Sequence, residues 1–267
     1  MEKTALSVDN WKDRLICQLK IRGYSRKTIR AYMFHVGRYL SSGLGFDEFI
    51  LNLVNEGKSA SSVRQAGFAV KFFLRHLCMQ ETSNLPNVKS DKKLPVILSK
   101  GEIDRMILSS YNLIHRLMLQ MLYSTGMRVG ELIDLKWEDI DFERNIIHIK
   151  VAKGRKDRIV MLSSRVKREL KKLPVERKGN LFLSARRKKY NLSTIEKIVS
   201  KAAVKAGISK KVTPHALRHA FATHLLEKGV DIRYIKDLLG HSKIETTMIY
   251  TKVSNKELCK IKSPLDF

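Results

Sequence analysis

The chain has 267 residues, 43% of them hydrophobic, so it is long enough for two domains and apolar enough to give them buried cores. This composition excludes a wholly disordered chain. Lysine and arginine number 52 against 26 aspartates and glutamates, a formal net charge of +26. Residues 1–85 and residues 86–267 are both basic, which suits a nucleic-acid partner but does not by itself distinguish one from an ordinary basic protein.

Cysteine usage and hydropathy bear on the compartment. The three cysteines, Cys17, Cys78 and Cys259, are scattered and form no CxxC pair, which favours a reducing environment. The start of the chain lacks the apolar core of a signal peptide, and the best apolar run, residues 66–74, is interrupted by Lys71 and is too short to span a membrane. We expect a cytoplasmic protein without a membrane partner.

The N-terminal part of the chain has a helical pattern throughout. Apolar residues recur at helical spacing over residues 8–21, 25–40, 46–54 and 59–78. Turn-forming glycines separate these stretches. The pattern predicts four packed helices in a first domain of residues 1–85.

The helical pattern of apolar residues ends after this first domain. Residues 86–98 hold a charged segment flanked by prolines and show no apolar period, as is typical of a linker. Ser99 and Glu102 then stand at the spacing of a capping box, which predicts a new helix start. A second domain is therefore expected over residues 99–267.

The second domain mixes helices with a small β-hairpin. Residues 113–123 predict a buried helix, with Gly126 as its C-cap. Residues 145–151 and 158–162 are rich in β-branched residues and are separated by a polar turn. The chain after Ser163 is mainly helical in pattern. The expected fold is mainly α with a small β-hairpin or sheet, a helical domain followed by a mixed α/β domain.

Arg128 opens a short helix immediately after the turn at Gly126. Glu131 lies three residues further on, so both side chains share a helical face. Such a carboxylate could hold the guanidinium and leave its fork for two phosphate oxygens. Taken alone, Arg128 also fits an ordinary surface arginine.

A second cationic pair stands at another helix start. Thr213 and Pro214 form an N-cap followed by proline at the first helical position. His215 and Arg218 then share one face of the first turn. Because free amides and the helix dipole attract anions at this end, both side chains are well placed to meet a phosphate.

The spacing of His215 and His219 also allows a zinc pair. Position 216 is alanine, however, so the general base of an HExxH motif is missing. No nearby third ligand completes a metal site. We expect no metal here, and His219 and His224 are interpreted as packing or hydrogen-bonding residues.

Three further residues have side chains suited to the same chemistry. His241 follows the end of a helix, and Tyr250 lies nine residues later. A tyrosine hydroxyl, with a pKa near 10, needs a base or cationic surroundings to act as a nucleophile. Lys153 lies in the basic turn of the hairpin, where a lysine could protonate a leaving alkoxide. A second basic run, residues 186–189, fits either a DNA-backbone contact or a solvated loop.

Four segments together resemble one family. Residues 125–132, 215–225, 239–242 and 246–251 are similar to the arginine boxes and the nucleophile segment of the tyrosine recombinases, the phage-integrase family. The resemblance spans nearly the whole chain and is strongest to short Xer-type members. It implies six catalytic residues, namely Arg128, Lys153, His215, Arg218, His241 and Tyr250.

The resemblance implies the following chemistry for the nucleophile and the arginines. Tyr250 would attack the scissile phosphate and leave a 3′-phosphotyrosyl link beside a free 5′-hydroxyl. Arg128 and Arg218 would neutralise the charge that develops on the non-bridging oxygens. No cofactor, metal or ATP would be needed, because the phosphotyrosine keeps the energy of the broken bond.

The resemblance also implies roles for the other residues and for the partners. His215 would assist proton transfer with Tyr250, His241 would hydrogen-bond the phosphate, and Lys153 would protonate the leaving oxygen. The two domains, a core-binding and a catalytic one, would clamp double-stranded DNA. The tail after Tyr250 would dock on a neighbouring subunit, giving dimers and tetramers on DNA.

Other functions are compatible with the same residues. A type IB topoisomerase uses similar residues but reseals the same strand. A DNA-binding protein that has lost catalysis is a further alternative, although all six positions carry suitable side chains. Among recombinases, an Xer-like role in chromosome dimer resolution is expected first, and integration of a mobile element is the alternative.

Overall fold

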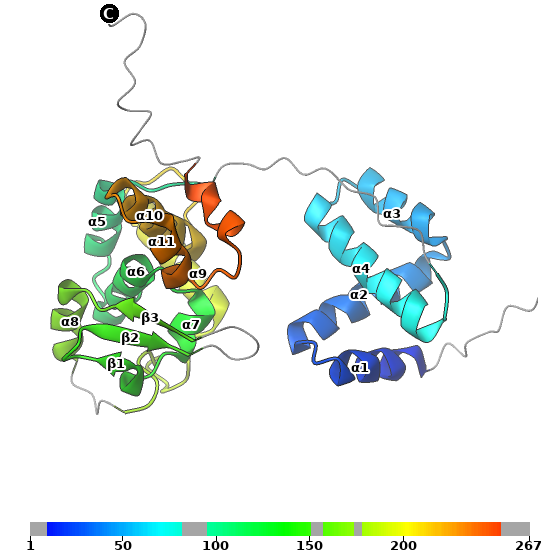
Figure 1. Cartoon of the computed structure of the whole chain (residues 1–267), viewed down its shortest axis with the longest axis horizontal. Helices are drawn as coiled ribbons and strands as arrows, with labels where there is room; N and C mark the ends of the chain where they lie inside the picture. Colours follow the sequence, from blue (N-terminus) through cyan, green and yellow to red (C-terminus); the bar gives the residue numbers. More distant parts are fainter. Residues whose placement is uncertain (1–9, 82–94, 151–156, 174–177, 252–267) are drawn as a thin grey trace, which may run out of the picture. The chain divides into compact units, whose positions relative to one another are not determined.

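The structure, a computed structural model, describes residues 10–81, 95–150, 157–173 and 178–251. The chain divides into two compact units, Met1–Lys93 and Leu94–Phe267 (Figure 1). Within the described ranges, none of the helices combines the length and the apolar character needed to cross a membrane.

The first unit is built from the helices that the apolar periodicity predicted. They are α1 (Trp11–Ile21), α2 (Arg26–Ser42), α3 (Phe46–Asn55) and α4 (Ala60–Leu77). Ser25 and Ser59 cap α2 and α4 by accepting hydrogen bonds from backbone N–H groups of the first turn. The apolar faces of the helices enclose one core, in which Leu15, Val36 and Phe73 are buried.

The second unit contains the remaining helices. Its α-helices are α5 (Lys100–Leu108), α6 (Leu113–Thr125), α7 (Val129–Asp134), α8 (Ser164–Lys171), α9 (Leu192–Lys205), α10 (Pro214–Glu227) and α11 (Ile232–Leu239). Short 3₁₀ helices are η2 (Trp137–Asp139), η3 (Ile244–Thr246) and η4 (Met248–Tyr250). The predicted capping box at Ser99 and Glu102 begins α5, and Thr213 with Pro214 begins α10 as expected.

A three-stranded antiparallel sheet completes this unit, in the order β1-β2-β3. The strands are β1 (Ile140–Asp141), β2 (Ile146–Ile149) and β3 (Arg158–Met161). In the predicted hairpin, Ile147 pairs with Val160, and both side chains are buried against the helices. The mainly helical fold with a small sheet is thus confirmed. The strand β1 was not predicted, because two residues are too few to show a period.

Helices α6 and α10 pack against each other. Arg218 of α10 contacts the end of α6 at Gly126. The large core of the unit includes Leu117 and Leu122 of α6, Leu217 of α10 and Trp137 of η2. Gly126 ends α6 in the left-handed region, with φ +61°. A Cβ atom at Gly126 would lie 2.4 Å from the ring of Phe221, so only glycine allows α6 and α10 to approach this closely.

We expect Gly126→Ala to lower the melting temperature of the second unit by several degrees. An alanine here would be strained by the left-handed backbone, and its methyl group would overlap the ring of Phe221. Together these effects should lower the free energy of unfolding by at least about 2 kcal/mol. Gly130→Ala is the matched control. It lies four residues away inside α7, where no atom lies within 4 Å of the added Cβ, so its melting temperature should stay equal or rise slightly. Equal melting of the two variants in calorimetry would contradict the role of Gly126.

Candidate active site

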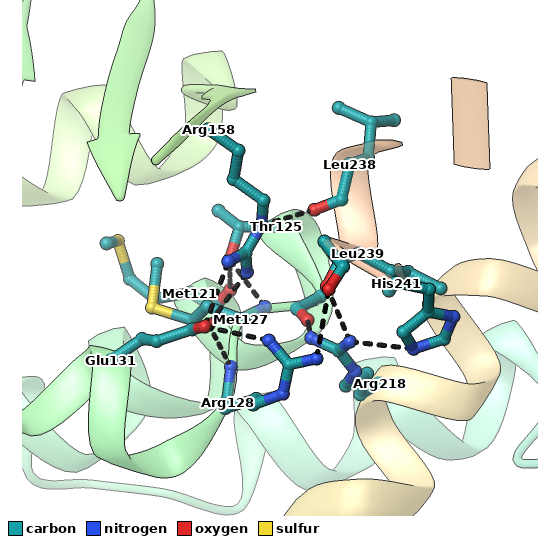
Figure 2. Close-up of polar contacts among 12 residues, drawn as sticks. Met121, Thr125, Met127, Arg128, Glu131, Arg158, Arg218, Leu238, Leu239 and His241 are labelled. Atoms are coloured by element: carbon teal, nitrogen blue, oxygen red, sulfur yellow. Dashed lines mark hydrogen bonds and ion pairs between the residues drawn. The ribbon is translucent and has the colours of Figure 1, made fainter. Parts of the chain in front are cut away.

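Three of the predicted site residues, Arg128, Arg218 and His241, lie close together although they come from separate segments of the second unit (Figure 2). These segments meet at two left-handed turns, Gly126 and Gly240. The turn at Gly126 sends the chain from α6 into α7, with Arg128 as the N-cap of α7. The turn at Gly240 ends α11 and leads directly into His241. Arg218 lies in α10. Two helix ends and the side of a third helix therefore form the floor of the site.

Arg218 lies at the centre of these segments and is only 3% exposed. Its Nη1 donates to the carbonyl of Gly126 at 2.5 Å, and its Nη2 donates to the carbonyl of Leu239 at 2.7 Å. Burial, and then repulsion from Arg128, lower the pKa of Arg218 to about 10. The guanidinium therefore stays charged at neutral pH. It joins the ends of α6 and α11 to α10.

Arg128 is the more accessible of the two arginines, with 24% of its side chain exposed. Its Nη1 donates to Oε1 of Glu131 at 2.9 Å, and its backbone N–H donates to Oε2 at 2.7 Å. Its Nη2 lies 3.4 Å from the carbonyl of Gly240. The expected support of Arg128 by Glu131 is therefore present. Burial alone would raise the pKa of Glu131, but hydrogen bonds from Arg158 and Arg128 lower it to about 2, so the carboxylate is ionised.

Arg158 is a member of this cluster that sequence reasoning missed. It begins β3, and its guanidinium contacts both oxygens of Glu131, with the ion pair at 2.7 Å. In the sequence it is one basic residue among several beside the polar turn, so no local signal separates it from solvated neighbours. Figure 2 shows Arg128 and Arg158 converging on Glu131.

The hydrogen bonds of His241 indicate its tautomer. Its Nε2 lies 3.0 Å from Nη2 of Arg218, which can only donate, so Nε2 accepts. Its Nδ1 then carries the proton and donates to Oγ1 of Thr247 at 2.9 Å. Burial, and then the charges of Arg218 and Arg128, lower the pKa of His241 to about 4. The imidazole is therefore neutral at physiological pH.

Tyr250 is buried, with 2% of its surface exposed. Its hydroxyl lies 3.0 Å from Nδ1 of His219, and its ring packs with Phe221, Ile235 and Leu239. Burial raises the pKa of the Tyr250 hydroxyl, and the charges of Arg218 and Arg128 oppose that rise. In this conformation the hydroxyl is shielded and hydrogen-bonded, while the positive charges that would favour its ionisation lie nearby.

The histidine against this hydroxyl is His219, whereas the family resemblance implied His215. Burial, and then His215 and Arg218, lower the pKa of His219 to about 4, so it is neutral. His215 is exposed in the first turn of α10, and its ring centroid lies 6.3 Å from that of His219. Positions 215 and 219 share one helical face, so the sequence alone could not show which ring meets the tyrosine. The interpretation of His219 and His224 as hydrogen-bonding residues is confirmed, since His224 bonds Tyr123 at 2.9 Å.

Two basic segments were also predicted to contact DNA or the leaving group. Lys153 lies outside the described residues. The basic run at residues 186–189 is exposed, and Lys189 forms an ion pair with Asp134 at 2.7 Å. Across the described ranges, no group of three or more histidine, cysteine, aspartate or glutamate side chains is placed to hold a metal ion.

A site of two arginines, a neutral histidine and a tyrosine on a helical scaffold with a small sheet is suited to phosphoryl transfer through a tyrosine. Comparison with known proteins identifies the class: residues 97–257 match the phage integrase family. The chain belongs to this family and is a tyrosine recombinase, an enzyme that cleaves and rejoins DNA.

Individual relatives are consistent with this membership. The tyrosine recombinase XerA of Pyrococcus horikoshii is 37% identical over 252 residues, which cover 90% of this chain and 88% of the relative. A crystal structure of a XerA recombinase matches 94% of this chain and 97% of its own, with 34% identity and a TM-score of 0.58. The XerH recombinase bound to a palindromic difH substrate shares the fold, with a TM-score of 0.72 at 23% identity, over 96% of this chain and 85% of its own.

Proposed function

We propose that this chain is a site-specific recombinase with an Xer-like role, the resolution of chromosome dimers, and that it acts through a phosphotyrosyl intermediate on Tyr250. The observation that carries the proposal is the gathering of Arg128, Arg218 and His241 around the turns at Gly126 and Gly240. Tyr250 of η4 is held nearby through its hydrogen bond with His219 of α10. The Xer-like role is supported by the 37% identity to XerA of Pyrococcus horikoshii over 90% of the chain.

The chemistry follows from the charges at the site. A phosphodiester undergoing attack gains negative charge on its non-bridging oxygens, and preorganised cations stabilise that charge most effectively in a site of low dielectric constant. Arg218 is fixed by its backbone contacts. Arg128 is more accessible, and each of its terminal nitrogens has a second N–H besides the one that contacts Glu131 or Gly240. Neutral His241 carries its proton on Nδ1, so it would offer the phosphate a hydrogen bond only after its Thr247 contact is released.

The burial of Tyr250 adds a step before attack. Because the hydroxyl is shielded and bonded to His219, the segment of η3 and η4 has to shift for the oxygen to meet a phosphate. We propose that a histidine of α10 accepts the tyrosine proton as the P–O bond forms. His215 is the family's residue for this role, and His219 already contacts the hydroxyl. Lys153 is proposed to protonate the departing 5′-oxygen.

The two parts of the chain are proposed to share the DNA. Residues 1–85 would form a helical DNA-binding domain, residues 86–98 a linker, and residues 99–267 the catalytic domain. The support is the surplus of basic residues on both sides of the linker; the whole chain has 52 lysines and arginines against 26 aspartates and glutamates. Duplex DNA is therefore the proposed partner of both domains.

Assembly through the C-terminal tail is proposed as well. A groove of about 680 Å³ in the second unit has Leu98, Phe221 and Leu225 among its lining, together with Lys100, Lys210 and Lys228. The tail contains the segment Leu265-Asp266-Phe267, whose two apolar side chains and one carboxylate complement this lining. Deleting residues 255–267 should leave binding of a single chain to DNA intact but prevent pairing of two DNA sites in a gel-shift assay. Undiminished pairing by the truncated chain would exclude the tail.

The function can be tested with DNA of random sequence. We expect incubation of the protein with such duplexes in EDTA, followed by denaturation, to yield covalent protein–DNA adducts at preferred sequences, with the 3′-phosphate attached to Tyr250. Sequencing of the trapped ends gives the target site, and exchange between two copies of that site separates recombination from relaxation by a topoisomerase. Cleavage that requires a divalent metal and leaves no adduct would refute the proposal.

A further inference from the structure

Arg158 is a buried arginine to which the proposed chemistry assigns no role. Its side chain is 7% exposed. Nη1 and Nη2 donate to the two carboxylate oxygens of Glu131 at 2.9 and 2.7 Å, and Nε donates to the carbonyl of Leu238 at 2.7 Å. All three guanidinium nitrogens therefore have partners within the protein. These contacts use three of its five N–H groups, and burial of the side chain keeps the guanidinium from acting as a DNA contact.

The Glu131 carboxylate is fully occupied by two arginines. A carboxylate offers about four acceptor positions. Oε1 accepts from Nη1 of Arg128 and Nη1 of Arg158, and Oε2 accepts from the backbone N–H of Arg128 and Nη2 of Arg158. As a result, only one terminal nitrogen of Arg128 is engaged by the carboxylate. The paired, fork-to-fork geometry that arginine favours with a carboxylate is taken by Arg158.

The same guanidinium supports the turn that leads to His241. Leu238 lies two residues before Gly240, and a Cβ at Gly240 would lie 3.1 Å from Cδ of Arg158. The turn therefore rests on the side chain of Arg158. In the sequence, Arg158 also follows Lys153 by five residues, so it ties the strand after the proposed acid to the carboxylate that orients Arg128.

We propose that Arg158 is a positioning residue for DNA cleavage. It saturates Glu131, so that Arg128 keeps N–H groups and its charge for the scissile phosphate, and it fixes the turn before His241. The inference rests on the proposed role of Arg128. Glu131, Arg128 and Arg158 together carry one net positive charge. Without Arg158, Arg128 becomes the sole partner of a buried carboxylate, and the pair presents no net charge to DNA.

A purely structural ion pair and this positioning role predict opposite signs in a double variant. If Arg158 only held the fold together, Glu131→Gln added to Arg158→Met would leave cleavage no faster than in Arg158→Met alone. If Arg158 prevents capture of Arg128, removing the negative charge of Glu131 releases Arg128 again. Addition of the second substitution should then restore activity lost through the first.

The experiment measures single-turnover formation of the covalent adduct by the full-length chain. The substrate is a duplex that carries a cleavage site identified from the trapped adducts. We expect Arg158→Met to slow adduct formation roughly one hundredfold at unchanged DNA affinity, as loss of one oriented charge does. The double variant Arg158→Met/Glu131→Gln should be at least tenfold faster than Arg158→Met. Arg116→Met, which breaks the Arg116–Glu169 pair at 3.3 Å between α6 and α8, should cleave like the unaltered chain.

The outcomes separate this inference from the proposed function. Rates are compared only for variants whose melting curves show a folded second unit. Should Arg158→Met not fold, Arg158→Gln, which is also neutral but keeps donors for Leu238 and Glu131, replaces it with the same expected sign. A double variant as slow as the single one overturns the positioning role. Unaltered cleavage by Arg128→Ala instead removes the proposed clamp on which the inference rests.

Discussion

Tyr250→Phe is expected to abolish the covalent DNA adduct while leaving the affinity for duplex DNA nearly unchanged. The substitution removes only the hydroxyl oxygen, and the ring still fills its position among Phe221, Ile235 and Leu239. Loss of the bond to His219 should lower the free energy of unfolding by about 1 kcal/mol. Adduct formation on a radiolabelled site, read on a denaturing gel, measures the first effect, and filter binding measures the second.

Tyr123→Phe provides the control for this experiment. Tyr123 bonds Nδ1 of His224 at 2.9 Å, as Tyr250 bonds Nδ1 of His219 at 3.0 Å, and both histidines belong to α10. The two variants therefore lose the same kind of tyrosine–histidine bond and a similar amount of stability. Only Tyr250→Phe should lose cleavage. An adduct that persists in Tyr250→Phe would exclude Tyr250 as the nucleophile.

Arg218→Ala is expected to slow cleavage by roughly two to three orders of magnitude, because one preorganised charge facing the developing oxyanion is lost. It should also lower the melting temperature, since the carbonyls of Gly126 and Leu239 and Nε2 of His241 would all lose their donor inside the protein. Single-turnover cleavage and thermal melting, measured on the same preparation, report the two losses separately.

Two further variants separate the effect of the Arg218 charge on cleavage from its effect on stability. Arg128→Ala should show a comparable loss of cleavage with less loss of stability, because the Arg128 side chain is 24% exposed and Glu131 retains Arg158. Arg218→Lys keeps the charge but loses the planar fork that reaches two carbonyls, so it should recover stability only in part. Normal cleavage by Arg218→Ala at full stability would place the phosphate clamp elsewhere.

The parts of the fold that were predictable are those encoded locally. Helix starts are predicted within four residues by Ser99 with Glu102 and by Thr213 with Pro214. The structure begins α5 and α10 at these positions. Gly126 predicts the end of α6 in the same way. The pairing of Arg128 with Glu131 was also within reach, because residues three apart on a helix are neighbours in any fold that forms the helix.

The remainder of the site depends on contacts between distant segments. Arg158 meets Glu131 across 27 residues of sequence, and His219 meets Tyr250 across 31. Nothing in the residues around Arg158 shows which of several basic side chains will turn inward. The burial of Tyr250 was equally inaccessible, because it depends on how η4 packs on α10 rather than on the residues of the segment itself.

Arg218 has both a proposed catalytic charge and a structural role, and this limits how its position can change in evolution. Its contacts with Gly126, Leu239 and His241 mean that loss of this side chain also loosens the ends of α6 and α11. Tyr250, by contrast, can lose its oxygen and still fill its place. A lineage that keeps DNA binding but abandons strand cutting should therefore retain the arginine and vary the tyrosine. A surviving arginine at this position is poor evidence of activity, and the tyrosine is the residue to inspect.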